Sequence, residues 1–322
     1  MCTAICFRAG SGYFGRTLDL ECSYQEKVAV TPRNYPLRPR HLPPIFNHYA
    51  FIGMATIANG EPLYYDGINE KGLAIAGLNF PGNAHYYPAH EGKTNVAHFE
   101  LVPWVLASFQ KVDEFMEVAD KLNITQDVYS DLYPAATLHW IVSDSKQSVV
   151  VESTNNGLNV YENPWDVLAN NPTFPVMIDN LKQYNHLTNL PQQIGFTQLK
   201  PDSRGAGSMG LPGDLTSKSR FVRAVFNKHY SVSNDSESAL ISQFYHILGS
   251  VNQVQGSVKV GNQYVRTQYT SCCNMKKGIY YYTTYENSQI TGICISDHNL
   301  DDKKVITYPL IRTQQFRFQK PI

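Results

Sequence analysis

MCTAICFRAGSGYFGRTLDL, residues 1–20, decides the fold that we expect of this chain. Two short runs of strand-forming residues, 3–7 and 13–18, lie on either side of Gly10, Ser11 and Gly12. Glycines between two such runs are typical of a β-hairpin, because they accept the backbone conformations of a tight turn. The sequence therefore predicts that the chain begins with a hairpin, with Cys2 at the start of its first strand.

Cys2 is the first candidate for a reactive group. Methionine is removed when the next side chain is small, so we expect Met1 to be removed and Cys2 to become the N-terminal residue. The free α-amine has an ordinary pKa of roughly 7.7–8, and a general base is most effective near the working pH. One residue can then supply both a thiol nucleophile and the base that activates it. The alternative is that the cysteine stands at position two incidentally.

The register of the hairpin decides which side chains lie near Cys2. A tight turn at Gly10 and Ser11 places Cys2 directly across from Asp19, whose carboxylate could hold the amine. Arg16 then points to the other face, because side chains alternate along a strand. A shift of one residue brings Arg16 to the Cys2 face and moves Asp19 away. Both can approach Cys2 only if a bulge or a strong twist interrupts the strand.

Strand patterns dominate the rest of the chain, and helical patterns separate them. The expected strands cover residues 51–58, 138–142, 148–152, 158–161, 264–269, 279–285 and 290–295. The expected helices cover residues 99–109, 113–122, 220–226 and 239–248. Antiparallel strand blocks that alternate with helix pairs indicate an α+β fold, in which sheets pack together under helices. Neither a repeat nor a linker is evident, so we expect one domain over residues 1–322.

Composition excludes several classes of partner. Basic and acidic residues balance at 27 each, so the chain has no general attraction to nucleic acid or to an anionic membrane. No apolar run reaches the roughly 18–20 residues that cross a bilayer, and no secretory pattern opens the chain, so we expect a cytoplasmic protein. The cysteines and histidines lack metal-ligand spacing, and no metal site is expected. Gly205, Gly207 and Gly210 spell GxGxxG, but without the flanking strand and helix that a dinucleotide cofactor requires.

Eight segments between residue 1 and about residue 287 together resemble the choloylglycine hydrolase family, whose best-known branches are bile salt hydrolases and penicillin V acylases. The segments are MCTAICF, YFGRTLDL, YDGINEKGLAIAGLNFPG, TLHWIVSD, NNPTF, GLPGDLTSKSRFVRA, QYTSC and IYYYTTYEN. Any one of them is weak evidence, but their occurrence in order is specific. The resemblance implies the four-layer αββα sandwich of N-terminal-nucleophile (Ntn) hydrolases, assembled as a homotetramer without cofactor or metal.

The resemblance also implies roles for residues of the N-terminal hairpin. Cys2 would be the nucleophile, with its own amine as the base. Arg16 would lie near the thiol, where a cation favours the thiolate. Asp19 would orient the amine. Taken alone, Asp19 could equally well be the residue that ends a strand.

Three further residues are implied by segments far along the chain. The side-chain amide of Asn170 and the backbone N–H of Asn79 would hold the oxyanion of the tetrahedral intermediate. Arg223 would complete the cluster by supporting its charges. Without the resemblance, Asn79 could be a turn residue, Asn170 the start of a loop and Arg223 a solvated charge on a helix.

Asn79 and the segment GLNFPG resemble the bile-salt branch, which implies hydrolysis of glycine- or taurine-conjugated bile salts through a thioester at Cys2. A steroid needs a wide apolar pocket, and the residues that we expect to line it are Leu18, Tyr24, Tyr65 and Leu132. Two alternatives remain open. The same site could serve a penicillin V acylase or an N-acyl-homoserine-lactone acylase, or the fold could be kept by a catalytically silent binding protein.

Overall fold

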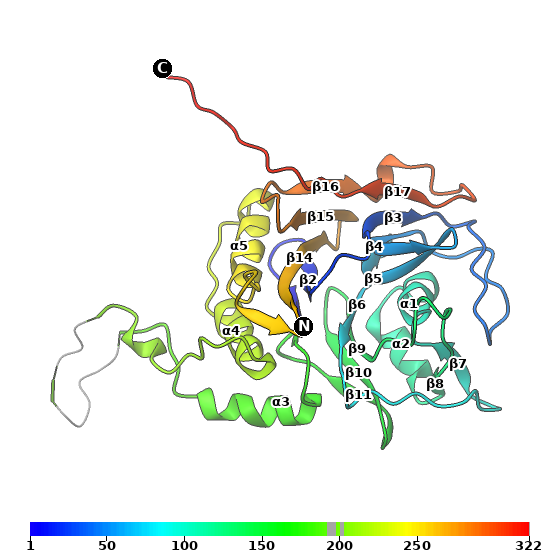
Figure 1. Cartoon of the computed structure of the whole chain (residues 1–322), viewed down its shortest axis with the longest axis horizontal. Helices are drawn as coiled ribbons and strands as arrows, with labels where there is room; N and C mark the ends of the chain where they lie inside the picture. The colour runs from blue at the N-terminus through cyan, green and yellow to red at the C-terminus, as the bar shows by residue number, and fades with distance from the viewer. Residues whose placement is uncertain (192–197, 200–202, 322) are drawn as a thin grey trace.

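The computed structural model describes residues 1–191, 198–199 and 203–321. Two antiparallel sheets pack face to face at its centre, and helices cover the outer face of each sheet (Figure 1). This is the four-layer αββα arrangement of an α+β protein, which confirms the fold class expected from the sequence.

The first sheet carries the N-terminal hairpin at its centre. In spatial order its strands are β12 (Val167–Leu168), β1 (Cys2–Phe7), β2 (Tyr13–Leu20), β14 (Gln263–Asn274), β15 (Ile279–Thr284) and β16 (Thr291–Cys294), with β13 (Val258–Val260) paired to β14. Because sheet and helices cover both faces, nearly every residue of β1 and β2 is buried.

The second sheet is built mainly from the middle of the chain. In spatial order its strands are β11 (Gly157–Glu162), β10 (Ser148–Thr154), β9 (Leu138–Ser143), β6 (Ala74–Asn79), β5 (Glu61–Asn69), β4 (Phe51–Ala58), β3 (Lys27–Thr31) and β17 (Ile306–Pro309). A separate parallel pair, β7 (Thr94–Ala97) and β8 (Leu122–Thr125), lies beside its helices.

Two groups of helices form the outer layers. They are α1 (Leu101–Ser108) and α2 (Val112–Ala119) on the second sheet, and α4 (Ser217–His229) and α5 (Glu237–Gly249) on the first, with α3 (Phe174–Leu181) packed beside α4 (Figure 1). One apolar core fills the space between the sheets and continues under α4 and α5, and a second core lies under α1 and α2. None of the helices among the described residues is long and apolar enough to span a membrane.

The hairpin forms as predicted, but in the other register. Cys2 pairs with Leu18, and Ala4 pairs with Arg16, so the expectation that Cys2 faces Asp19 is wrong. The last pair is Phe7 with Tyr13, which leaves residues 8–12 as a longer loop than the tight turn at Gly10 and Ser11 would give. The longer loop moves the pairing by one residue and brings Arg16 to the Cys2 face.

The other expected elements form with shifted ends. The expected helix at 99–109 is α1, and its Pro103 lies in the first turn, where a backbone N–H would have no partner within the helix. The strand expected at 264–269 is the first half of the longer β14. Helix α3 and eight strands were not expected from the sequence; the strands are β3, β5, β6, β7, β8, β12, β13 and β17.

Candidate active site

The thiol of Cys2 lies between the two sheets, beneath a buried arginine. Cys2 is only 2% exposed, and Nη2 of Arg16 donates a hydrogen bond to its Sγ. The Arg16 side chain is held by the carbonyl oxygens of Gly77, at 2.5 Å from Nη1, and of Thr17, at 3.1 Å from Nε. Burial alone would lower the pKa of Arg16, but the groups around it, Cys2 first and Asp66 among them, raise it above its ordinary value. Arg16 is therefore a fixed cation in hydrogen-bond contact with the Cys2 sulfur.

The backbone of Cys2 is held from the other side by polar side chains. Its N–H donates to Oδ1 of Asn170 at 2.7 Å, and Nη1 of Arg220 donates to its carbonyl oxygen at 2.5 Å. Arg220 also donates to Oδ1 of Asn170, at 2.7 Å from Nη2. Met1 continues the pairing with Asp19, since the Asp19 N–H donates to its carbonyl oxygen at 2.9 Å. In the chain that keeps Met1, the Cys2 nitrogen is therefore an amide.

Asp19 lies on the opposite face of β2 from Arg16. Its carboxylate accepts hydrogen bonds from the hydroxyls of Thr267, at 2.7 Å, and Thr17, at 3.1 Å. Burial raises the pKa of Asp19, while Arg220 and the N-terminal ammonium group oppose that rise. The pairing of β1 with β2 is regular as far as Leu18, so the bulge considered between Arg16 and Asp19 does not appear in the hairpin; a register shift lies instead on β14, between Thr267 and Tyr269. Arg16 therefore contacts the thiol, whereas Asp19 lies beside the N-terminal nitrogen.

Asn79, the last residue of β6 in the second sheet, and Asn170, two residues after β12 of the first sheet, meet beside Cys2. Nδ2 of Asn170 donates to the Asn79 carbonyl oxygen at 2.6 Å. The N–H of Phe80, the residue after Asn79, donates to the Thr137 carbonyl oxygen at 2.8 Å. Along an antiparallel strand, successive residues direct their N–H groups to opposite sides. The Asn79 N–H therefore points away from β9. On that side the pairing of β6 with β5 stops at Ala76. The N–H of Asn79 is therefore directed to the same side as its carbonyl, toward Asn170.

Arg223 does not join this cluster. Its guanidinium donates to the carbonyl oxygens of Ser250, Pro212 and Asp214, at 3.0, 2.8 and 2.6 Å. Arg220, one turn earlier on α4 and 0% exposed, occupies the position expected of Arg223. The segment SKSRFVRA holds two arginines three residues apart, which lie on one side of a helix, so the sequence offered no means to choose between them.

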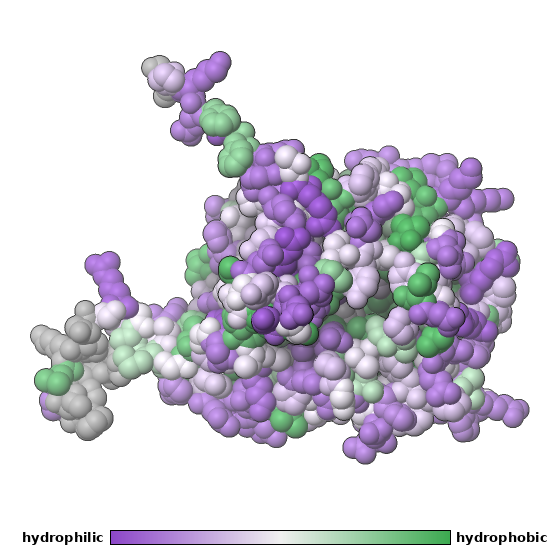
Figure 2. Space-filling view, in the orientation of Figure 1, coloured by the Kyte–Doolittle hydropathy of each residue, from purple (hydrophilic) through white to green (hydrophobic). Residues whose placement is uncertain are grey.

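A cavity of about 440 Å³ opens over Cys2, within the range of pockets that bind small molecules. All four expected wall residues, Leu18, Tyr24, Tyr65 and Leu132, line it. Lining residues that were not expected include Phe99, Val102, Tyr129, Tyr133 and Leu138, mostly from loops far from the hairpin. The face seen in Figure 2 is hollowed to the right of its centre, between apolar patches.

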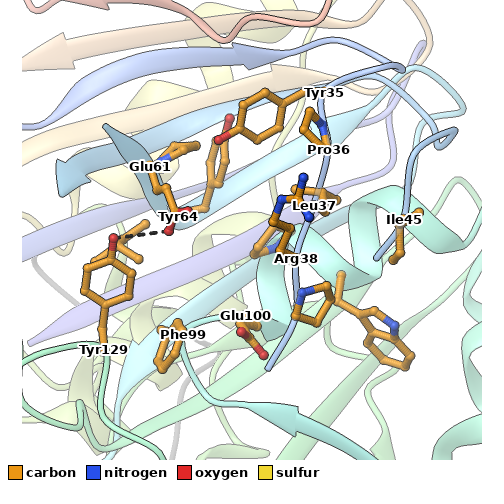
Figure 3. A pocket seen from close by; sticks show the side chains of 15 residues that line it. Tyr35, Pro36, Leu37, Arg38, Ile45, Glu61, Tyr64, Phe99, Glu100 and Tyr129 are labelled. Carbon is orange, nitrogen blue, oxygen red and sulfur yellow. Dashed lines mark hydrogen bonds between the residues drawn. The ribbon is translucent and has the colours of Figure 1, made fainter. Parts of the chain in front are cut away.

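A smaller hollow of about 90 Å³ lies behind one wall of this cavity. The two share Tyr64, Phe99 and Tyr129, and the Tyr129 hydroxyl donates to Oε2 of Glu61 at 3.2 Å (Figure 3). This hollow is well below the several hundred Å³ of typical ligand pockets. Within residues 1–191, 198–199 and 203–321, no cluster of three or more His, Cys, Asp or Glu residues is placed to hold a metal ion.

Comparison with known proteins agrees with this geometry. Residues 2–308 match the family model of linear amide C–N hydrolases, choloylglycine hydrolase family. The bile salt hydrolase/transferase of Lactiplantibacillus plantarum is 47% identical over 98% of this chain and 99% of that protein. The bile salt hydrolase/transferase of Clostridium perfringens is 40% identical, over 97% of this chain and 98% of that protein.

Solved structures of other proteins also resemble this chain. The crystal structure of the C2A mutant of conjugated bile acid hydrolase from Clostridium perfringens superposes with a TM-score of 0.92 at 38% identity, over 99% of this chain and 100% of that chain. Penicillin V acylase from Agrobacterium tumefaciens shares the fold, with a TM-score of 0.73 at 21% identity, over 95% of this chain and 90% of that chain. This chain therefore belongs to the choloylglycine hydrolase family of linear amide C–N hydrolases.

Proposed function

We propose that this enzyme hydrolyses the amide bond of glycine- or taurine-conjugated bile salts and releases the free bile acid and the amino acid. The observation that carries the proposal is the position of the Cys2 thiol, which lies against Arg16 at the base of an apolar cavity large enough for a steroid. Relatives named bile salt hydrolase/transferase align with nearly the full chain and support this substrate class.

Removal of Met1 is the first step of the proposed mechanism. It converts the Cys2 nitrogen from an amide into an amine, which can accept the proton of the thiol. The thiolate then attacks the carbonyl carbon of the substrate amide, and an S–C bond forms. The protonated amine returns its proton to the leaving nitrogen as the C–N bond breaks, which leaves a thioester at Cys2. Water, activated by the same amine, attacks the thioester and releases the bile acid.

The oxyanion of each tetrahedral intermediate needs donors in fixed positions. An asparagine side chain has two N–H donors, and only one of those on Asn170 is used by the Asn79 carbonyl. The second N–H of Asn170 and the backbone N–H of Asn79 are the proposed oxyanion donors. We further propose that Asp19 and Arg220 hold the N-terminal residue in place, the first near the amine and the second through the Cys2 carbonyl.

The proposal extends to assembly and location. We propose one domain over residues 1–322 that forms a homotetramer in the cytoplasm. The C-terminal segment leaves the body of the molecule (Figure 1), and on it Phe316 is 75% and Phe318 is 88% exposed. Two exposed aromatic side chains on this segment are available for contact with a neighbouring subunit, which supports the proposed assembly. All six cysteines are unpaired thiols, which supports a reducing compartment.

A matched assay of glycocholate, taurocholate and penicillin V tests the substrate class. We expect one of the bile salts to be turned over faster than penicillin V, and the reverse order would favour the acylase alternative. Cys2→Ala should abolish turnover of the preferred substrate. Cys6→Ala is the control and should keep turnover, because burial raises the pKa of the Cys6 thiol to about 12 and leaves it protonated. Equal loss in both variants would contradict the assignment of the nucleophile.

A further inference from the structure

The mechanism above leaves one buried ionisable pair unused. His139 on β9 and Glu152 on β10 both have fully buried side chains, and Nδ1 of His139 lies 3.1 Å from Oε1 of Glu152. Their neighbours Ile141 and Val150, which point to the same side of the sheet, belong to the core between the two sheets. The pair therefore lies inside the molecule, between the layers that meet at Cys2.

The pair is bonded to both ends of the segment that carries Asn170. Nε2 of His139 lies 2.8 Å from the carbonyl oxygen of Ala169, the residue before Asn170. Oε1 of Glu152 accepts a hydrogen bond of 3.0 Å from the N–H of Phe174, where α3 begins. The two side chains thus hold the segment of residues 169–174 at both of its ends.

The same histidine contacts the strand that carries Asn79. Its ring stacks on that of Phe80, the residue after Asn79, with 4.1 Å between ring centroids and 5° between planes. His139 also pairs with Leu78, the residue before Asn79, in the ladder between β6 and β9. His139 therefore touches the immediate neighbours of both proposed oxyanion donors.

The hydrogen bonds determine where the protons are. A carbonyl oxygen only accepts, so the bond to Ala169 requires a proton on Nε2 of His139. The bond between Nδ1 and Glu152 then holds one further proton, shared by the imidazole and the carboxyl group. Replacing the carboxyl group by an amide removes that proton, and a neutral imidazole can then keep only two of the three hydrogen bonds of the pair.

Stability gives little reason to keep such a pair. Taking two ionisable groups out of water is costly, and well-packed apolar residues of similar volume are often as stable or more stable. Oε2 of Glu152 is buried and has no hydrogen-bond partner among the described residues, which adds to the cost.

We propose that His139 and Glu152 are positioning residues that set the distance between the backbone N–H of Asn79 and the side-chain amide of Asn170. The proposal rests on the proposed function, because it assumes that these two groups hold the oxyanion. A displacement of about 1 Å in such a group can lower the rate about a hundredfold.

Three variants separate the contacts. His139→Gln can still donate to Ala169, since its amide nitrogen falls near the position of Nε2, whereas His139→Asn can reach Glu152 only. Glu152→Gln keeps the shape of the pair and removes its proton. We expect His139→Asn and Glu152→Gln to lower kcat on the order of a hundredfold with KM changed by less than about threefold, and His139→Gln to lose about tenfold or less.

The rate at which iodoacetamide alkylates Cys2 distinguishes a positioning role from a merely structural one. A general disturbance of the site would lower this rate together with kcat. Alkylation forms no oxyanion, so we expect it to stay within about threefold of the wild-type rate in all three variants. His246→Gln, an exposed residue of α5, is the matched control for replacing a histidine. A wild-type kcat in both His139→Asn and Glu152→Gln would overturn the proposal, and so would an alkylation rate that falls in parallel with kcat.

Two further results keep the test decisive. If His139→Asn does not fold, which thermal unfolding detects, the nearly isosteric Glu152→Gln decides alone. If the wild-type enzyme cleaves penicillin V in preference to bile salts, the substrate class of the proposed function fails. The comparison of variants then runs on penicillin V and judges the positioning pair separately.

Discussion

Two buried arginines meet Cys2 from opposite sides, and they differ in what balances their charge. Arg16, at the thiol, acts in the field of Asp66, a buried carboxylate that accepts hydrogen bonds of 2.6 Å from the hydroxyls of Tyr269 and Tyr280. Burial raises the pKa of Asp66, and the positive charge of Arg16 opposes that rise. For Arg220, burial lowers the pKa and Asp19 raises it. Asp19 also raises the pKa of Arg16, so the two arginines share one acidic residue and Arg16 has Asp66 in addition.

The choice of Arg220 over Arg223 can be tested directly. Arg220→Met removes the donor to the Cys2 carbonyl and to Asn170, so we expect kcat to fall on the order of a hundredfold. Arg223→Met loses only contacts with loop carbonyls, and it should lower the unfolding free energy more than it lowers kcat. Steady-state kinetics and urea unfolding of both variants check this, and a larger loss of kcat in Arg223→Met would contradict the assignment.

His98, in the cavity wall, makes stability depend on pH. Burial lowers its pKa to about 4, and its Nε2 accepts a hydrogen bond from the Ala136 N–H, which only the neutral ring can do. The unfolded chain takes up this proton near pH 6.5 and the folded chain only near pH 4. The contribution is thus fully present above pH 6.5 and is lost as the pH falls toward 4, by an amount on the order of 3 kcal/mol.

His98→Gln should flatten that dependence, because glutamine does not titrate but can still accept from Ala136. Urea unfolding at several pH values between 7 and 4 measures the slope for both proteins. His246→Gln, on an exposed site, should leave the slope unchanged. The explanation is wrong if the His98→Gln protein loses stability over this range as steeply as the wild type.

The positions of single residues in the site were predictable from the sequence where those residues belong to a recognisable motif. Cys2, Arg16, Asn79 and Asn170 lie together, and Leu18, Tyr24, Tyr65 and Leu132 line the cavity. Phe99 and Tyr129 were not foreseen, because loops that meet only in the folded chain bring them to the cavity. His139 lies within the quoted segment TLHWIVSD, but its contacts with Phe80 and Ala169 join three distant parts of the chain.

Among the elements, the N-terminal hairpin illustrates what a pattern can and cannot specify. The residue pattern identified both strands, but pairing depends on the loop conformation, in which the Gly12 N–H donates to the Ala9 carbonyl at 3.0 Å. The presence of glycines in the loop does not by itself reveal this loop conformation. The bulge on β14 was equally hidden, because it arises from pairing with a strand almost 250 residues away in sequence.

Gly15 on β2 lies close to the backbone of β14. A Cβ atom there would lie 2.0 Å from the backbone oxygen of Ser271, and backbone cannot move aside as a side chain can. We expect Gly15→Ala to lower the unfolding free energy by at least about 2 kcal/mol and to lower kcat as well, because Arg16 is the next residue.

Gly249→Ala is the matched control for this prediction. No atom lies within 4 Å of a Cβ built there, so we expect a gain of about 0.4–1 kcal/mol from reduced freedom of the unfolded chain. Urea unfolding measures both variants. A Gly15→Ala protein as stable as the wild type would show that the two strands are not so close.

For the whole molecule, the two sheets place the halves of the site on facing surfaces. The first sheet supplies Cys2 and Arg16 from adjacent strands, and the second supplies Asn79. The alternation of strand and helix blocks predicted sheets that pack together under helices, and the family resemblance implied the four-layer αββα arrangement. That alternation did not predict that β17, near the C-terminus, pairs with β3, because such long-range pairing is decided by the packed core rather than by local sequence.

The C-terminal segment provides the test of assembly. Removing residues 313–322 takes away Phe316 and Phe318, which are exposed in the single chain. We expect sedimentation velocity to report a tetramer for the full chain and smaller species for the truncated one, with unchanged circular dichroism. A full chain that sediments as a monomer would contradict the proposed homotetramer, and an unchanged tetramer after truncation would show that these residues do not hold it together.

Catalysis by Cys2 requires a free amine at that residue, and a cleavable N-terminal extension tests this requirement most directly. The chain is prepared with an extension whose removal by a specific protease leaves Cys2 as the first residue, and intact mass confirms each form. Turnover of glycocholate is then measured before and after cleavage. We expect no turnover while the Cys2 nitrogen is an amide and full turnover once it is an amine. Equal turnover by the two forms would contradict that requirement.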